Sequence, residues 1–148
     1  MPQSEDQDRK DVTAVITAFF EAGKEKDLPA LAGFHAPAPI FSKFDENPPF
    51  TRQNSEEAFV YEQAAFANIS DYAYRIENLK VDIIGEAAVA TFYLTYSGIF
   101  VNDYSFEGSP TGSHVRVTMV LARSASGWKI AHEHFSRFPD WQKPQPPR

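Results

Sequence analysis

Two histidines flank a glutamate near the end of the chain, in the segment His132-Glu133-His134. The segment belongs to a predicted β-strand that begins at Trp128, and successive side chains of a strand point to opposite faces. The histidines therefore share one face and Glu133 lies on the other. Three interpretations are open. The histidines form a metal-binding pair, Glu133 is a buried acid or base, or these groups only make local hydrogen bonds.

Helices that could position this segment are indicated by the spacing of apolar residues. An amphipathic helix is predicted from about Asp11 to Glu25. A short second helix follows Asp27, which is a typical N-cap residue. A third helix is predicted from about Ser55 to Asn68, because Asn54 and Glu57 have the spacing of a capping box.

The second half of the chain has the alternation and the β-branched and aromatic content of strands. A short strand and a loop are also expected within Ile40–Phe50, and a loop at Asn102–Ser113. The long strands are predicted at Tyr72–Ile84, Ala87–Val101, Val115–Arg123 and from Trp128 onward. This order predicts an α+β domain with helices on one face of a curved antiparallel sheet.

Two stretches resemble nuclear-transport-factor-2-like domains. DVTAVITAFFEAGKEKDLPALAGFH, residues 11–35, is similar to their opening helices. RVTMVLARSASGWKIAHEHFSRFP, residues 116–139, resembles the closing hairpin of the SnoaL-like branch and of calcium/calmodulin-dependent kinase association domains. The resemblance covers roughly Val12 to Pro139. It implies a cone-shaped sheet wrapped around three N-terminal helices, a cystatin-like roll. The fold alone does not imply one activity, because it hosts isomerases, cyclases, dehydratases and oligomerisation modules.

The resemblance also indicates which face of the last strand is inside. It places Phe135 inside the cone, and Glu133 and Ala131 share the parity of Phe135. Trp128, Ile130, His132 and His134 are then expected on the outer face, an assignment that a single β-bulge would reverse. On the preceding strand the uniformly apolar series should face the helices; it comprises Val115, Val117, Met119 and Leu121.

Glu133 is the candidate catalytic residue under this assignment. A carboxylate in an aromatic pocket has a raised pKa, which suits a general acid or base. The alternative is a structural salt bridge with Lys129, Arg137 or Arg116.

The outer face is expected to form a subunit contact. His132 and His134 lack a defined third ligand, and the chain has no cysteine, so we expect neither a metal nor a cofactor. Trp128 would add a large apolar side chain to the same surface, and monomers rarely expose large apolar patches. We therefore predict a homodimer through the sheet, with Trp128, His132 and His134 at the contact.

The composition limits the classes of function. The chain has 148 residues, 14% aromatic residues and a net charge of −6. These values favour one domain with a large core or pocket and disfavour nucleic-acid or anionic-membrane partners. The polar N-terminus is unlike a secretory signal, and we expect a cytoplasmic protein. Residues 1–10 are expected to be disordered, 11–139 to form the domain, and 140–148 to form a proline-rich tail.

These observations predict a small-ligand-binding protein with an aromatic-lined cavity. It could also transfer protons on a small apolar carbonyl compound through Glu133. The alternative is a non-catalytic association module, and the sequence leaves open whether the protein is an enzyme. The expected cavity residues are Tyr61, Phe92, Tyr96, Met119 and Phe135.

Overall fold

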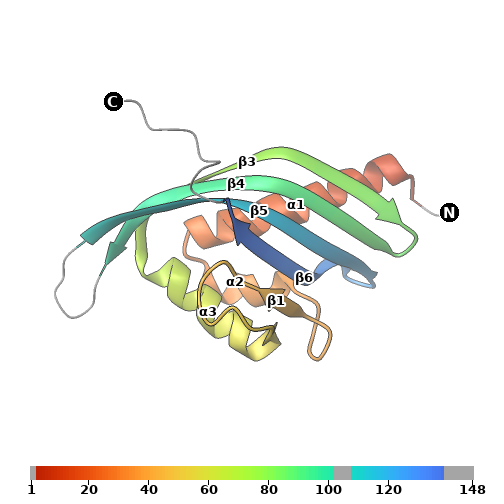
Figure 1. Cartoon of the computed structure of the whole chain (residues 1–148). Helices are drawn as coiled ribbons and strands as arrows, with labels where there is room; N and C mark the ends of the chain where they lie inside the picture. The colour runs from red at the N-terminus through yellow and green to blue at the C-terminus, as the bar shows by residue number, and fades with distance from the viewer. Residues whose placement is uncertain (1–2, 102–107, 139–148) are drawn as a thin grey trace.

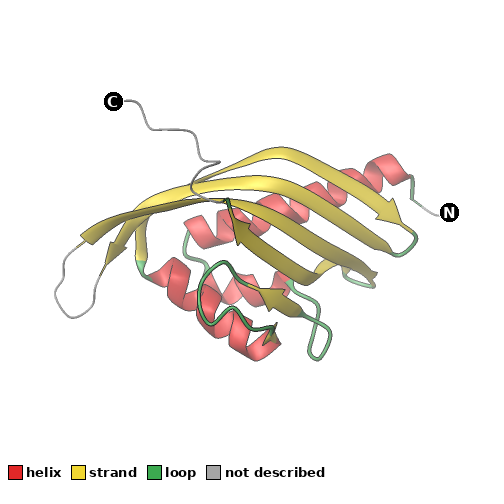
Figure 2. Ribbon diagram, in the orientation of Figure 1, coloured by secondary structure: helices red, strands yellow, loops and turns green. Residues whose placement is uncertain are grey.

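Three α-helices precede the long strands of one curved sheet (Figures 1 and 2). The computed structural model describes residues 3–101 and 108–138. The helical elements are α1 (Glu5–Lys24), α2 (Leu28–Leu31), the 3-10 helix η1 (Ala32–Phe34) and α3 (Ser55–Ala67). The strands are β1 (Ser42–Phe44), β2 (Gln53–Asn54), β3 (Ile69–Ile84), β4 (Ala87–Val101), β5 (Gly108–Ser124) and β6 (Gly127–Arg137). The strand order is β2-β1-β6-β5-β4-β3, and the helices lie on the concave side, which confirms the predicted α+β fold.

Capping residues set the helix boundaries. α1 begins at Glu5 rather than at about Asp11, because the Ser4 side chain accepts a hydrogen bond from the Gln7 amide. The prediction of a disordered segment up to residue 10 was therefore wrong for residues 5–10. The predicted capping box of α3 is confirmed, with reciprocal hydrogen bonds between Asn54 and Glu57.

The sheet joins segments that are far apart in the chain. β3, β4, β5 and β6 are antiparallel neighbours in that order, whereas β1 pairs in parallel with β6. This pairing sets Lys43 beside Glu133. β5 begins at Gly108, so residues 108–113, expected in a loop, extend the strand. The predicted tail at 140–148 lies outside the described residues.

A β-bulge near Ala131 changes the faces of β6. The register shifts between Val120 and Leu121 of β5, which oppose His132 and Ile130, and Ala131 has no partner. Trp128 and Ile130 consequently lie in the core and are 5% and 0% exposed. The prediction that Trp128 and Ile130 face outward was wrong, and Trp128 cannot contribute to a contact on the outer face.

The core fills the space between the concave sheet and α1. The predicted inward series of β5 is confirmed, since Val115, Val117, Met119 and Leu121 are all buried. α1 meets these side chains with Val12, Ile16, Phe19 and Phe20. None of the helices in residues 3–101 and 108–138 is long and apolar enough to cross a membrane.

Candidate functional site

Four ionisable side chains meet inside the fold, and we call them the central cluster: His35, Lys43, Glu62 and Glu133. His35 Nε2 lies 2.6 Å from Glu133 Oε1 and 3.5 Å from Glu62 Oε1. Lys43 Nζ lies 3.4 Å from Glu62 Oε1 and 3.6 Å from Glu133 Oε2. None of the four side chains is more than 9% exposed.

Backbone pairing brings the cluster together. The parallel register of β1 and β6 makes Lys43 and Glu133 neighbours. Just after η1, the Ala36 amide donates a hydrogen bond to the Ile130 carbonyl at 2.7 Å, which holds His35 beside β6. Glu62 lies one helical turn after the buried Ala58 on α3, so its side chain points into the domain.

Burial and neighbouring charges shift the pKa values of the cluster in different directions. Burial by itself would lower the pKa of His35, but the contacts with Glu133 and Glu62 raise it to about 10. Burial also disfavours the charged form of Lys43, but the carboxylates of Glu62 and Glu133 outweigh it and raise its pKa. Lys43 is therefore charged at neutral pH.

The pKa values of the two carboxyl groups in the central cluster shift in opposite directions. Burial would raise the pKa of Glu62, yet Lys43 and His35 outweigh it and lower the pKa. Burial together with the charge of Glu62 raises the pKa of Glu133. Glu62 is thus ionised at neutral pH, whereas burial and the nearby Glu62 disfavour the ionised form of Glu133.

Several polar atoms around the cluster have no hydrogen-bond partner. Glu62 and Glu133 each have an unpartnered, buried Oε2 atom. Gln53, which pairs with Lys43 across β1 and β2, is 1% exposed, and neither its amide oxygen nor its amide nitrogen has a partner. Buried polar atoms normally find a partner, so this cluster has unused capacity to bind a polar group.

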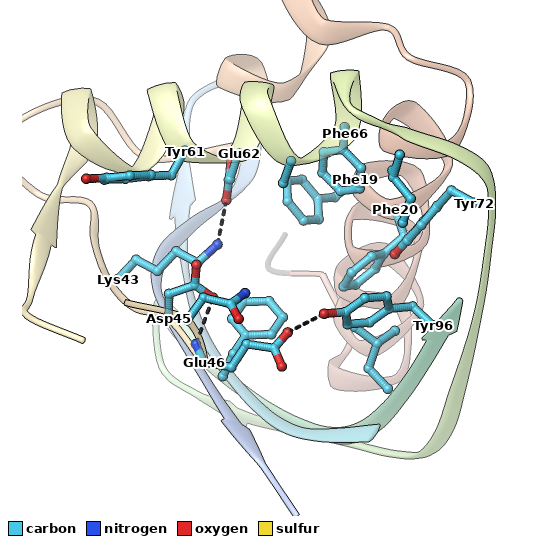
Figure 3. A pocket seen from close by; sticks show the side chains of 15 residues that line it. Phe19, Phe20, Lys43, Asp45, Glu46, Tyr61, Glu62, Phe66, Tyr72 and Tyr96 are labelled. Atoms are coloured by element: carbon cyan, nitrogen blue, oxygen red, sulfur yellow. Dashed lines mark hydrogen bonds and ion pairs between the residues drawn. The ribbon is translucent and has the colours of Figure 1, made fainter. Parts of the chain in front are cut away.

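An aromatic-lined cavity of about 130 Å³ opens beside Lys43 and Glu62 (Figure 3). Its wall combines side chains of α1, α3, β1, β3, β4, β6 and the loop after β1. In Figure 3 the rings surround a central space with Glu62 and Lys43 at its edge. The aromatic lining consists of Phe19, Phe20, Tyr61, Phe66, Tyr72, Tyr96 and Phe135.

A second cavity of about 410 Å³ lies on the other side of Glu62. Glu62 lines both cavities, whereas Lys43 lines the first and His35 the second. The remaining lining consists of Ala32, Ala36, Pro37, Ala38, Phe41, Ser55, Glu56 and Phe59.

A second buried carboxylate also lines the first cavity. Glu46 Oε1 accepts a hydrogen bond from the Tyr96 hydroxyl at 2.9 Å (Figure 3). Its Oε2 accepts from Ser113 at 2.9 Å and from Arg137 at 2.8 Å. We call these four residues the Glu46 network. Both oxygens of Glu46 have partners.

The predicted site residues divide into two groups. Tyr61, Tyr96 and Phe135 line the first cavity, whereas Phe92 and Met119 are buried and line neither of the two cavities. Both of these side chains belong to the hydrophobic core. Glu133 is buried with a raised pKa, as predicted, but it too lines neither cavity. The proposed salt bridges to Lys129, Arg137 and Arg116 do not form; Lys43 and His35 contact Glu133 instead.

The histidine pair of β6 lies on the other face. His132 is half-buried and its Nδ1 lies 2.8 Å from the Ser42 hydroxyl, while His134 is exposed. Among the described residues, the side chains close enough to share a metal ion are His35, Glu62 and Glu133, with ligand atoms within 4.8 Å. Lys43 already supplies a positive charge to both carboxylates of that group.

Sequence reasoning missed His35, Lys43 and Glu62. His35 and Lys43 approach Glu133 only through the parallel pairing near β6, which leaves no local pattern. Glu62 offered a signal, because it lies four residues from both Ala58 and Phe66, on the face that α3 turns inward.

Residues 12–140 match the family model of the SnoaL-like domain. The chain belongs to the SnoaL-like domain family. No curated protein sequence matches this SnoaL-like chain.

Solved structures share the fold of this SnoaL-like domain. A candidate dehydratase of the NTF2-like family from Streptomyces avermitilis is 21% identical with a TM-score of 0.77, over 92% of this chain and 99% of the other. A candidate aromatic ring hydroxylase from Novosphingobium aromaticivorans is 19% identical with a TM-score of 0.76, over 93% of each chain. The association domain of CaMKII from C. elegans is 17% identical with a TM-score of 0.68, over 91% of this chain and 99% of the other.

Proposed function

We propose that the protein binds a small, mostly apolar carbonyl compound in the first cavity and exchanges a proton with it through Glu62. The observation that carries this proposal is the position of Glu62. It is buried and ionised, has an unpartnered Oε2, and lines a cavity of otherwise aromatic character. A general base requires an available lone pair within reach of the substrate proton, and Glu62 is the residue of the cavity wall that we propose for this role.

The other members of the cluster have supporting roles. Lys43 lines the same cavity and is charged, so it can stabilise negative charge that develops on a carbonyl oxygen. Glu133, the residue favoured from sequence, contacts His35 at 2.6 Å and is proposed as a positioning residue.

The size of the cavity limits the ligand. An engineered apolar cavity of about 150 Å³ holds benzene, so a first cavity of about 130 Å³ suits a compound with a single small ring. Cyclohexanone is a suitable probe, and cyclohexane is its control without a polar group.

Proton transfer can be tested by incubating the protein with cyclohexanone in D₂O and following deuterium at the carbons next to the carbonyl. The native protein should accelerate this exchange above the rate in buffer. Glu62→Gln should lower the rate by about 10²-fold or more, the usual effect of losing a general base. Glu46→Gln is the matched control, because Glu46 lines the same cavity but has partners on both oxygens.

Binding is checked separately by protein NMR shifts on titration with cyclohexanone and cyclohexane. Shifts confined to residues of the first cavity are expected, and they should be larger for cyclohexanone. Exchange that is unaffected by Glu62→Gln, or the absence of any binding in the cavity, would refute the proposal.

Association is a second candidate function, and the outer sheet face supports it. In the part of the chain that the structure describes, no helix covers this face, and Tyr93 of β4 is 38% exposed there. A structure with the same fold is named as an association domain. We propose a homodimer through this face, with His132 and His134 near the contact.

Light scattering at micromolar concentration should then give about twice the chain mass. Tyr93→Glu should produce a monomer, because a buried unpaired charge is unfavourable by several kcal/mol, about 3–5. Ile84→Glu is the control, since Ile84 is also exposed but lies at the end of β3. A native monomer would exclude the dimer.

A further inference from the structure

The second cavity is an apolar groove with a buried histidine in its wall. The charged or ionisable residues of its lining are His35, Glu56 and Glu62. The side chains of His35 and Glu62 are 9% and 4% exposed, whereas Glu56 is an exposed residue. The apolar lining consists of Ala32, Ala36, Pro37, Ala38, Phe41 and Phe59.

His35 has one ring nitrogen available for a ligand. Its Nε2 contacts Glu133 at 2.6 Å and Glu62 at 3.5 Å. Among the described residues no hydrogen bond reaches its Nδ1, and Nδ1 is not one of the fully covered polar atoms without a partner. Nδ1 therefore keeps contact with accessible space, unlike Glu62 Oε2, which is covered. Of the two cavities, His35 lines only the second.

The charges around His35 favour an anionic ligand atom at Nδ1. The contacts with Glu133 and Glu62 raise the pKa of His35 to about 10, and a charged imidazole carries a hydrogen on both nitrogens. An oxyanion on such a donor forms a charge-assisted hydrogen bond, whereas an ammonium group would meet a like charge. The negative charge of Glu62 is already offset by Lys43, and that of the exposed Glu56 is screened by water.

We propose that the second cavity binds an apolar carboxylic acid in its carboxylate form, with one oxygen accepting a hydrogen bond from His35 Nδ1. The rings or chain of the acid pack against Phe41 and Phe59. The cavity of about 410 Å³ exceeds twice the volume of about 150 Å³ that holds benzene, so it has room for two fused rings. Such binding goes beyond the proposed function, because the cavity and the ligand are both different.

Three compounds with the same rings and different charges test the proposal on the native protein. The probe is 2-naphthoate, whose fluorescence reports binding. The neutral 2-naphthamide and the cationic 2-naphthylmethylammonium are its controls. The native protein should bind 2-naphthoate about tenfold more tightly than either control, the scale of a hydrogen bond between charged groups. Equal affinity for the three compounds, or no binding of 2-naphthoate at millimolar concentration, would overturn the proposal.

A matched pair of substitutions locates the bound acid. Of the two cavities, Ala32 lines only the second and Ala65 only the first, and both residues are exposed, so leucine at either position carries little risk to folding. Ala32→Leu should abolish binding of 2-naphthoate because it fills the groove, whereas Ala65→Leu should leave the affinity unchanged. The opposite result would place the acid in the first cavity and overturn the proposal.

Substitutions of the ionisable lining residues test the charge preference. His35→Gln should weaken binding of 2-naphthoate about tenfold or more. Glu56→Gln should tighten it about two- to fivefold, the scale of an exposed charge pair, because a like charge is removed. His114→Gln is the control, since His114 lines neither cavity. Circular dichroism checks folding, and the three-compound comparison decides if His35→Gln unfolds. Full affinity in a folded His35→Gln variant, or weaker binding by Glu56→Gln, would contradict the proposal.

Discussion

The two buried carboxylates that line the first cavity differ in how completely they are hydrogen-bonded. Glu46 accepts hydrogen bonds from Tyr96, Ser113 and Arg137, and both of its oxygens have partners. Glu62 contacts Lys43 and His35 through Oε1 alone, and its Oε2 is unpartnered. One cavity is thus lined by two glutamates, one with partners on both carboxylate oxygens and one with a partner on a single oxygen.

This difference separates a structural role from a chemical one. A saturated carboxylate such as Glu46 fixes the loop after β1 to β4, β5 and β6 and has little capacity for another donor. An unsaturated carboxylate in a low-dielectric site interacts strongly with any donor that enters. We therefore assign ligand chemistry to the central cluster and scaffolding to the Glu46 network.

The largest effects on the free energy of unfolding, and the most unequal ones, should come from substituting Lys43 of the central cluster and Arg137 of the Glu46 network. Lys43→Met removes one of the two buried cations that contact Glu62 and Glu133, the other being His35, and should cost about 3–5 kcal/mol of stability. Arg137→Met removes a side chain that is 49% exposed, so it should cost about 1 kcal/mol or less. Urea unfolding at neutral pH measures both, and equal losses would contradict the contrast.

The pH dependence of stability should come from the central cluster. The pKa of His35 is about 10 in the folded chain, against about 6.5 for an unfolded histidine. Folding therefore binds a proton between these values. The stabilisation is complete below about pH 6.5 and is lost as the pH rises through 10, by up to about 1.4 kcal/mol per pH unit.

Urea unfolding between pH 6.5 and 10 tests this slope, which His35→Gln should flatten. His132→Gln is the control. Burial and His134 lower the pKa of His132, so its proton linkage lies at more acidic pH and the substitution should leave the slope in place. A slope that depends on His132 and not on His35 would contradict the raised pKa of His35.

A smaller effect is expected within the Glu46 network. Tyr96→Phe removes one of three donors to Glu46 and should cost about 1 kcal/mol, the usual net contribution of a hydrogen bond. The slope between pH 6.5 and 10 should stay the same, because Tyr96 does not contact His35. A loss of stability as large as that caused by Lys43→Met would contradict the expected difference between the central cluster and the Glu46 network.

Treatment with a metal chelator should have the smallest effect on stability. His35, Glu62 and Glu133 could ligate an ion, but Lys43 already neutralises their charge. Chelator should leave the melting temperature unchanged, whereas a structural metal would stabilise the fold. A lower melting temperature, restored by zinc or manganese, would contradict this expectation.

The sequence predicted the elements better than the site, for a physical reason. Local signals such as the capping box at Asn54 and the alternation of Val115–Leu121 depend on neighbours in the chain, and both predictions were confirmed. The faces of Trp128 and Ile130 depend on one bulge at Ala131, which no residue type marks.

The central cluster shows the same limit. Glu133 could be selected because its parity matches that of Phe135, and its burial is confirmed. Its partner His35 lies 98 residues earlier and approaches it through a parallel pairing beside a three-residue strand. Such a contact depends on the tertiary fold, and no periodic pattern in the sequence predicts it.

Carboxyl NMR during ligand titration tests the central claim most directly. Protein labelled with ¹³C at glutamate carboxyl groups is titrated with cyclohexanone, and Glu62→Gln and Glu46→Gln assign the two resonances. The account predicts that the Glu62 resonance shifts on binding while the Glu46 resonance stays in place. A shift of Glu46 with an unchanged Glu62 would contradict it, because the saturated carboxylate would then be the one that meets the ligand.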